Sequence, residues 1–391
     1  MPLRAIYSYA WDIAERGVGD FIAEIKSLGL NTVTFAGSYH AGKFIRPKGK
    51  RGKVYFPEDG TAYFRAERSR YGKIQPIENS LLRDSDVLKH LCASSIAVNA
   101  WMVLLHNTRL GTEHPQATVE NAFGDRYVYS LCPSAPEARE YAVALCRDMT
   151  DNYPVIGLSL ETPGFLPYQH GFHHEFALMK QNRWFDALMG LCFCEHCQRG
   201  ARGHGIDAAG LRTRVARDTE AYLESEIDYP DDMAEVLWLA DAQEGEMSAY
   251  LRFRCETVTS LIGEIRTGVR KDAAVAIIPS VARPTAGAWY EGTDLGALAR
   301  SPGIVEACFY ESSVARIQAD VMDVRRRMGG AGHLRGILRP AWPDLQSKAD
   351  VIGAVNALRD AGVADIAFYN YGHLRRSSLA WVAEALAVLG D

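Results

Sequence analysis

Short apolar runs alternate along the chain with longer segments that repeat apolar positions every three or four residues. The apolar runs are rich in β-branched and aromatic residues, as strands are. We predict eight strands, at residues 4–11, 32–39, 96–106, 155–161, 274–280, 304–311, 334–340 and 365–371. The segments between them predict amphipathic helices, the clearest of which lie at residues 18–29, 135–153 and 349–362.

Eight repeats of strand and helix are typical of an α/β protein built as a (β/α)8 TIM barrel. The alternative is an open, doubly wound parallel sheet. Such a sheet usually carries a glycine-rich phosphate-binding turn after its first strand. Residues 8–17 follow the first strand here and contain no such turn. The pattern therefore favours the closed barrel.

Two long stretches interrupt the regular period of strands and helices. We expect one barrel domain over residues 1–391, with a loop insertion at 40–85 after the second strand and another at 162–272 after the fourth. The second insertion contains three closely spaced cysteines and long helical patterns. Because barrel active sites form from the loops at the carboxyl ends of the strands, both insertions are expected to roof a pocket.

The composition is that of an ordinary globular protein, with 48% hydrophobic residues, 23% charged residues and a net charge of -5. This charge argues against nucleic-acid binding, and the basic segment 46–53 is interpreted as a solvated loop. The first residues lack the order of a secretory signal, and no segment has the apolar length of a membrane span. With eight cysteines in such a chain, we expect reduced thiols and a cytoplasmic location.

Three of these cysteines, Cys192, Cys194 and Cys197, form a C-x-C-x-x-C segment. Thiols at this spacing can converge on one tetrahedral metal ion, which wants a fourth ligand. The best upstream candidate is Cys132, and His196 inside the turn is a second choice. The competing interpretation is that the thiols are small buried hydrophobic residues, but the spacing favours a metal site.

Three segments together resemble the zinc-containing β-galactosidases of glycoside hydrolase family 42. They are CPSAPEARE at 132–140, YPVIGLSLE at 153–161 and CFCEHCQRGARGHGI at 192–206. In that family two cysteine turns share a zinc ion, and the strand between them ends in the acid/base glutamate. The resemblance implies Glu161 as the acid/base. It also implies a structural zinc held by Cys132, Cys192, Cys194 and Cys197.

The chain departs from the family pattern at two positions. The family has asparagine before its acid/base glutamate, where this chain has Leu160. Its nucleophile is a glutamate that ends the seventh strand, where this chain has Arg339. A fixed cation there would bind an anion, which motivates the hypothesis of an acidic sugar or phosphorylated substrate.

Glycoside hydrolysis needs two carboxyl groups that flank the scissile bond. Strand ends supply the candidates, because the carboxyl ends of barrel strands line the mouth. Glu161 ends the fourth strand and ranks first, and Glu311 ends the sixth and ranks second. Asp344 follows the seventh strand and ranks third. The predicted catalytic residues are therefore Glu161 and Glu311.

Aromatic and hydrogen-bonding side chains gather at the other predicted strand ends. Such a mixture suits the apolar faces and hydroxyl groups of sugars, although the aromatic residues could simply pack the barrel. The predicted substrate-binding residues are Tyr39, His40, Arg46, His106, Asn107, His170, Tyr310, Arg339, Trp342, Asp344, Tyr369 and Asn370.

The segment HGFHHE at 170–175 offers further ligands, in His173, His174 and Glu175. Its spacing matches no strict metal motif, and substrate contact or hydrogen bonding within the loop is favoured over a metal site.

The sequence thus predicts a glycosidase that acts on a small carbohydrate, with a structural zinc and no nucleic-acid or membrane partner. Two alternatives stay open: a metal-assisted lyase, isomerase or epimerase acting on a sugar or sugar acid, and a non-catalytic sugar-binding barrel. Assembly into a homo-oligomer is a further possibility, since the last residues are apolar.

Overall fold

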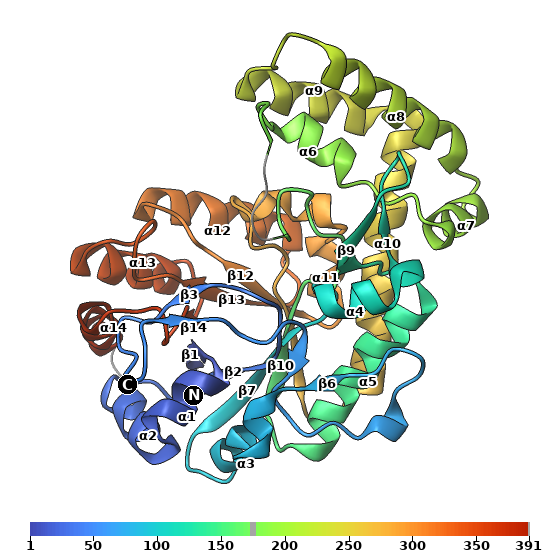
Figure 1. Cartoon of the computed structure of the whole chain (residues 1–391). Coiled ribbons are helices and arrows are strands. Elements are labelled where there is room, and N and C mark those ends of the chain that lie inside the picture. The colour runs from blue at the N-terminus through green and yellow to red at the C-terminus, as the bar shows by residue number, and fades with distance from the viewer. Residues whose placement is uncertain (173–176, 390–391) are drawn as a thin grey trace.

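A computed structural model describes residues 1–172 and 177–389 and has a closed barrel of eight parallel strands at its centre (Figure 1). Strand β1 pairs with β14 on one side and with β2 on the other, which closes the barrel. The predicted TIM-barrel fold is confirmed. In chain order the barrel strands are β1 (Arg4–Ser8), β2 (Thr32–Tyr39), β7 (Ala97–Val103), β10 (Gly157–Glu161), β11 (Ala274–Ile277), β12 (Ile304–Cys308), β13 (His333–Leu338) and β14 (Asp365–Phe368).

Helices cover the outside of the barrel and bury one apolar face each against it. In α12, for example, Ile317, Val321, Val324 and Met328 recur at helical spacing and are buried, and Ser313 caps the first turn. The helices that follow barrel strands are α1 (Ala10–Arg16), α2 (Val18–Ser27), α3 (Val87–Cys92), α5 (Pro136–Asn152), α10 (Gly245–Gly268), α11 (Leu295–Arg300), α12 (Val314–Met328), α13 (Lys348–Asp360) and α14 (Arg376–Val388).

A polar layer crosses the barrel interior beneath the mouth. Glu306 of β12 accepts hydrogen bonds from Tyr7 of β1, at 2.9 Å, and from Ser159 of β10. Asn99 of β7 donates to Ser159 at 2.8 Å. Because every member has a partner, this network ties four strands together without leaving an unpaired buried charge.

The loop after β2 carries short strands and single turns. Strand β5 pairs antiparallel with the end of β2, and β3 pairs with β4 as a hairpin. The elements of this loop are β3 (Phe44–Ile45), β4 (Val54–Tyr55), β5 (Thr61–Ala62), η1 (Arg68–Arg70), β6 (Ile77–Glu78) and η2 (Ser80–Arg83).

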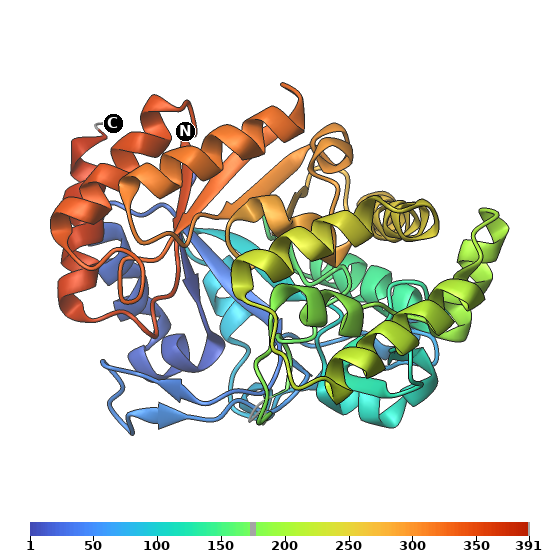
Figure 2. The same ribbon diagram turned by 90° about the horizontal axis from the view of Figure 1, so that it is seen from above.

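The loops after β7 and β10 carry the remaining elements. The loop after β7 contains a hairpin whose second strand leads into Cys132, and the loop after β10 contains helices that project to one side of the barrel (Figures 1 and 2). The elements after β7 are α4 (Thr108–Glu113), η3 (Pro115–Ala117), β8 (Thr118–Glu120) and β9 (Arg126–Leu131), and those after β10 are α6 (Arg183–Met189), α7 (Glu195–Gly203), α8 (Ala208–Glu224) and α9 (Asp231–Gln243).

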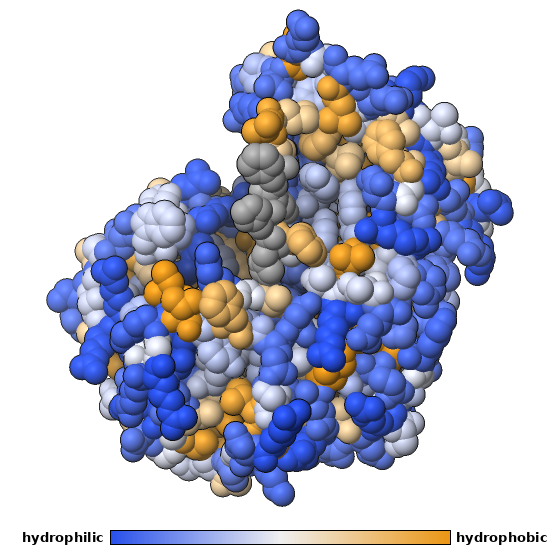
Figure 3. All heavy atoms as spheres, viewed as in Figure 1, coloured by the Kyte–Doolittle hydropathy of each residue, from blue (hydrophilic) through white to orange (hydrophobic). Residues whose placement is uncertain are grey.

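The face in Figure 3 is hollowed between the barrel and the lobe formed by α6, α8 and α9, and apolar side chains lie on both sides of the hollow. None of the helices within residues 1–172 and 177–389 combines the length and apolar character needed to cross a membrane.

Candidate active site and metal centre

Glu161 is the last residue of β10, and its side chain lies at the carboxyl end of the barrel. The residue is 9% exposed, and the Trp101 indole N–H of neighbouring β7 donates to its Oε2 at 2.5 Å. Burial raises the pKa of the Glu161 carboxyl to about 7, against the lowering effect of the Trp101 hydrogen bond. The group can therefore hold or release a proton near neutral pH.

Thr162 follows Glu161 directly and has a backbone φ of 52°, in the left-handed region that β-branched residues avoid. Thr162 is buried, and its Oγ1 has no hydrogen-bond partner among the described residues. Strained residues of this kind are held in place by their surroundings and gather at functional sites. The hydrophobic pattern contains no sign of this turn, so the sequence did not reveal it.

Three tyrosines meet over Trp101 at the mouth of the barrel. The Tyr9 hydroxyl lies 3.0 Å from that of Tyr39 and 3.0 Å from that of Tyr369, and the Tyr39 and Trp101 ring centroids are 5.0 Å apart. Burial, with the neighbouring phenols, raises the pKa of Tyr9 well above its ordinary value. The cluster therefore offers neutral hydroxyl groups. Tyr39 and Tyr369 were predicted, whereas Tyr9 was treated only as a strand residue.

Three predicted histidines stack beside this cluster. The His40 ring lies between those of Tyr39 and His106, at centroid distances of 4.3 and 4.1 Å. His170 packs edge-on against His106 at 5.6 Å. The remaining residues of the predicted histidine-rich segment, His173, His174 and Glu175, lie outside the described residues.

Asp344 is fully buried and joins two arginines that come from different loops. It accepts hydrogen bonds from Arg283 Nη1, at 2.5 Å, and from Arg339 Nε. The Arg339 guanidinium lies 4.5 Å from the centre of the Tyr310 ring, and Arg283 also donates to the Tyr310 carbonyl. The predicted group of Tyr310, Arg339 and Asp344 is thus in mutual contact, and Arg283 is an additional cation.

Trp342, by contrast, is 79% exposed. Asn370 is buried, and its Oδ1 accepts from the Gly372 N–H at 3.0 Å. Its Nδ2 has no partner among the described residues.

Three other predicted site residues are engaged in structural contacts. Glu311 is 2% exposed and forms an ion pair with Arg316 Nε at 2.5 Å. Arg46 is buried between Asp12, at 2.7 Å, and Glu15, at 2.8 Å. Asn107 caps α4 and also donates to the Gly60 carbonyl at 3.1 Å.

A second buried carboxyl group belongs to Glu291, whose backbone carbonyl accepts from the Phe165 N–H in the loop that follows Glu161. Glu291 ends the single-turn helix η4 (Thr285–Glu291), and the Ser280 hydroxyl donates to its Oε1 at 2.5 Å. The residue is 7% exposed. Its place in the sequence is far from any predicted strand end, so nothing in the strand pattern indicated it.

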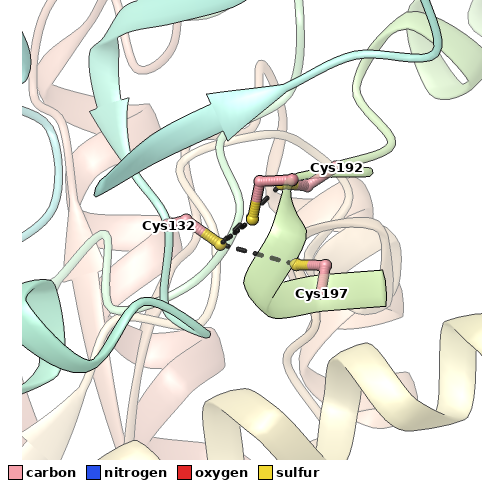
Figure 4. Close-up of side chains that lie close together, drawn as sticks. Cys132, Cys192 and Cys197 are labelled. Carbon is pink, nitrogen blue, oxygen red and sulfur yellow. Dashed lines mark hydrogen bonds between the residues drawn. The ribbon is translucent and has the colours of Figure 1, made fainter. Parts of the chain in front are cut away.

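The four predicted thiols converge at a buried point between the loops after β7 and β10. The Cys132 sulfur lies 3.8 Å from that of Cys192, 3.6 Å from that of Cys194 and 3.5 Å from that of Cys197 (Figure 4). All four sulfurs lie within 4.8 Å of one another. A tetrahedral ion with metal–sulfur bonds of about 2.3 Å needs sulfurs roughly 3.8 Å apart. The cluster can therefore hold a metal ion.

Backbone contacts fix this cluster before any metal binds. The Cys132 N–H donates to the Ala117 carbonyl at 2.8 Å, and the Phe193 N–H donates to the Glu120 carbonyl at 2.6 Å. Burial raises the pKa of the Cys132 and Cys197 thiols well above the ordinary value, whereas hydrogen bonds with the other three thiols lower the pKa of Cys194. Thiolates that are buried from solvent need a bound cation, which agrees with a closed structural metal site.

No protein-family model matches the sequence, and no curated protein matches it. Solved structures do match. The catalytic domain of β-amylase from Paenibacillus polymyxa superimposes with a TM-score of 0.60 at 10% identity, over 100% of this chain and 98% of that one. Alpha-L-fucosidase isoenzyme 2 from Paenibacillus thiaminolyticus gives a TM-score of 0.55 at 11% identity over 100% of this chain, which spans 49% of the fucosidase. The chain therefore has the barrel fold of these two enzymes.

Proposed function

We propose that the chain is a glycoside hydrolase-like enzyme that cleaves a small glycoside or oligosaccharide, with Glu161 as its acid/base. The observation that carries the proposal is the burial of Glu161 at the end of a barrel strand, which raises its pKa to about 7. A carboxyl group in this state can protonate a leaving oxygen and later accept a proton from water. The fold shared with a β-amylase and a fucosidase supports this reaction class.

The groups around Glu161 suit a sugar. The Tyr9, Tyr39 and Tyr369 hydroxyls can donate to and accept from sugar hydroxyl groups. Trp342 is exposed at the rim and offers a flat face to sugar C–H surfaces, and the stacked rings of His40 and His106 lie beside the tyrosines. Trp101 holds the Glu161 carboxyl in one orientation through its indole N–H.

Glu311 is our candidate for the second carboxyl group. It lies three residues after β12, is nearly fully buried and forms an ion pair with Arg316. A second carboxyl group is what glycoside hydrolysis needs as nucleophile or base. Because the Arg316 side chain is 58% exposed, it can turn toward solvent when substrate arrives.

The four-cysteine cluster is proposed to hold a structural zinc ion, as in family 42. The sulfur separations fit a tetrahedral ion, and four protein ligands leave no open position for a reacting water. The ion would cross-link the loops after β7 and β10. None of the eight cysteines forms a disulfide bond, which supports a reducing, cytoplasmic environment.

A panel of neutral, uronic and phosphorylated aryl glycosides tests this function. With the substrate that is turned over, Glu161→Gln is expected to lower kcat by about 10²–10⁴-fold, because the amide cannot transfer the proton. Glu264→Gln, which alters an exposed carboxylate on α10, is the matched control. Turnover by Glu161→Gln close to that of the wild type would refute the acid/base role.

One observation favours acidic substrates within the panel. Arg283 and Arg339 share the single carboxylate of Asp344, so the site carries a surplus of positive charge near Tyr310. Arginines of this kind bind carboxylates and phosphates. If uronate substrates are cleaved to unsaturated products without addition of water, the enzyme is a lyase and not a hydrolase. Binding of sugars without turnover would instead indicate a sugar-binding barrel.

A further inference from the structure

A polar pocket of about 800 Å³ lies between helices α1, α2 and α14, where the first and last helices of the barrel meet (Figure 1). Residues 46–50, in the loop after β2, line one part of it. Neither Glu161 nor any of the three clustered tyrosines is among the lining residues. The pocket is therefore large enough for a small molecule and is separate from the proposed acid/base.

The basic segment at residues 46–53 packs against this pocket. Arg46 is 7% exposed, and its guanidinium lies 2.7 Å from the Asp12 carboxylate and 2.8 Å from that of Glu15. Glu15 also accepts the Lys50 backbone N–H at 3.0 Å. The interpretation of this segment as a solvated loop is thus wrong for Arg46, whereas the Lys50 side chain is exposed.

Lys48 contributes a partly buried ammonium group to the pocket. Its Nζ donates to the Tyr371 carbonyl and, at 2.9 Å, to the Leu374 carbonyl, and it lies 4.0 Å from the centre of the Tyr371 ring. Burial lowers the pKa of Lys48 to about 8, although the charges of Glu24 and Asp12 raise it. Because carbonyl dipoles and an aromatic ring stand in for a full counter-charge, this ammonium group can still be stabilised by a bound anion.

Two arginines complete the positive side of the pocket. Arg16 Nε lies 3.1 Å from Glu24 Oε2, and the same oxygen accepts the Tyr371 hydroxyl at 2.8 Å, so one carboxylate serves both groups. Arg376 is the first residue of α14, and its side chain forms no hydrogen bond or ion pair with any other described residue. Both arginines act on Lys48 as like charges. Three cations thus converge on one pocket, an arrangement that a bound anion would stabilise.

We propose that this pocket binds a small molecule with a phosphate or carboxylate group, held between Lys48, Arg16 and Arg376. Arginine forks and ammonium groups are ordinary partners of such anions. Leu28 and Leu379 line the same pocket and offer an apolar contact to the organic part of the molecule. The proposal does not depend on the glycosidase activity.

The acidic residues of the pocket do not cancel this positive charge. Five basic and four acidic side chains line it. Three of the four carboxylates are already engaged, those of Asp12 and Glu15 by Arg46 and that of Glu24 by Arg16 and a tyrosine hydroxyl. The fourth, Asp20, is exposed.

Thermal unfolding in inorganic phosphate, compared with sodium chloride of equal ionic strength, tests the site. Phosphate is expected to raise the Tm of the wild type by about 1–3 °C, because a ligand that binds only the folded chain stabilises it. Arg376→Gln should lose this shift. Arg375→Gln is the matched control and should keep it, since Arg375 is an exposed neighbour that does not line the pocket.

Two further probes distinguish the kinds of anion. A larger Tm shift with glucose 6-phosphate than with glucuronate would identify an organic phosphate as the ligand class, and the reverse order would identify a carboxylate. In either case the shift should again be lost in Arg376→Gln.

The Arg283 and Arg339 pair beside Asp344 is the rival place for an anion. A phosphate shift that persists in Arg376→Gln but disappears in Arg339→Gln would overturn the proposal, as would the absence of a shift with all three probes.

Acylation of lysines by an N-hydroxysuccinimide ester at pH 8, read by mass spectrometry, locates the bound anion. Phosphate should slow the acylation of Lys48 by about five-fold, as a pKa raised by about one unit would at this pH. Acylation of Lys43, which is exposed and outside the pocket, should not change. Equal rates at Lys48 with and without phosphate would contradict binding at this place.

Discussion

A buried carboxyl such as that of Glu161 destabilises the fold whenever it is charged. The structure keeps it buried because Trp101 satisfies one of its oxygens and because the neighbouring Thr162 accepts a left-handed backbone. The buried carboxyl group and the left-handed Thr162 backbone both cost free energy. At the scale of single residues, the chain thus gives up stability at the position where we propose acid/base chemistry.

The pH dependence of stability follows from the same residue. The pKa of Glu161 is raised from 4.5 to about 7 in the fold, so the folded chain binds more protons than the unfolded chain between these values. Its contribution to stability is fully present below pH 4.5 and is lost as the pH rises through about 7. Glu161→Gln should therefore unfold like the wild type at pH 4 and be more stable at pH 8, by up to about 3 kcal/mol.

Urea unfolding of both proteins at the two pH values measures this difference. If Glu161→Gln were no more stable than the wild type at pH 8, Glu161 would not be a buried ionisable group. Gln is nearly isosteric with Glu, so the Trp101 hydrogen bond has an acceptor in both proteins.

At the scale of elements, the mouth of the barrel depends on how closely single-turn helix η4 approaches the loop after β10. Gly164 has no side chain, and the Glu291 carbonyl occupies the space where a Cβ atom would lie. A backbone atom cannot move aside as the end of a flexible side chain can. The contact therefore sets the relative position of η4 and β10.

Gly164→Ala should accordingly lower the free energy of unfolding by about 1–3 kcal/mol, as overpacking does. Gly263→Ala is the matched control, because Gly263 lies within α10 and has no heavy atom within 4 Å of the added Cβ. Alanine there is expected to raise stability by about 0.5–1 kcal/mol. If both substitutions changed the free energy of unfolding equally, the Glu291 carbonyl would not lie in close contact with residue 164.

At the scale of the whole molecule, the four cysteines connect parts of the chain that the barrel itself does not hold together. Cys132 follows β9 in the loop after β7, and the other three belong to the loop after β10 that carries α6, α7, α8 and α9. A metal ion bound there would fix the base of the helical lobe beside the barrel.

Metal analysis of the purified chain is expected to find one zinc ion per chain, and Cys194→Ser should lose it. Chelation should increase hydrogen exchange in residues 114–135 and 190–206 while the barrel strands stay protected, because only the loops depend on the ion. Cys255→Ser, outside the cluster on α10, should retain the metal. If the chelator removed the metal and hydrogen exchange in these loops did not change, the structural role would be excluded.

The hydrophobic pattern predicted all eight barrel strands, but it extended several of them too far. The predicted runs at 4–11, 96–106 and 304–311 continue past β1, β7 and β12. The extra residues, such as Tyr9, Leu104 and Phe309, are buried but lie beyond the ends of the regular strands. Pattern alone cannot separate these cases, since both bury apolar side chains.

The sequence by itself determined the barrel, the thiol cluster and the position of Glu161. Strand alternation, cysteine spacing and a strand end are local features, so they are visible in a linear chain. Only the tertiary structure decided which side chains meet, as Arg283 meets Asp344 and Glu311 meets Arg316. The first contact joins residues 61 positions apart, and burial and charge at such contacts depend on how the loops close over the barrel.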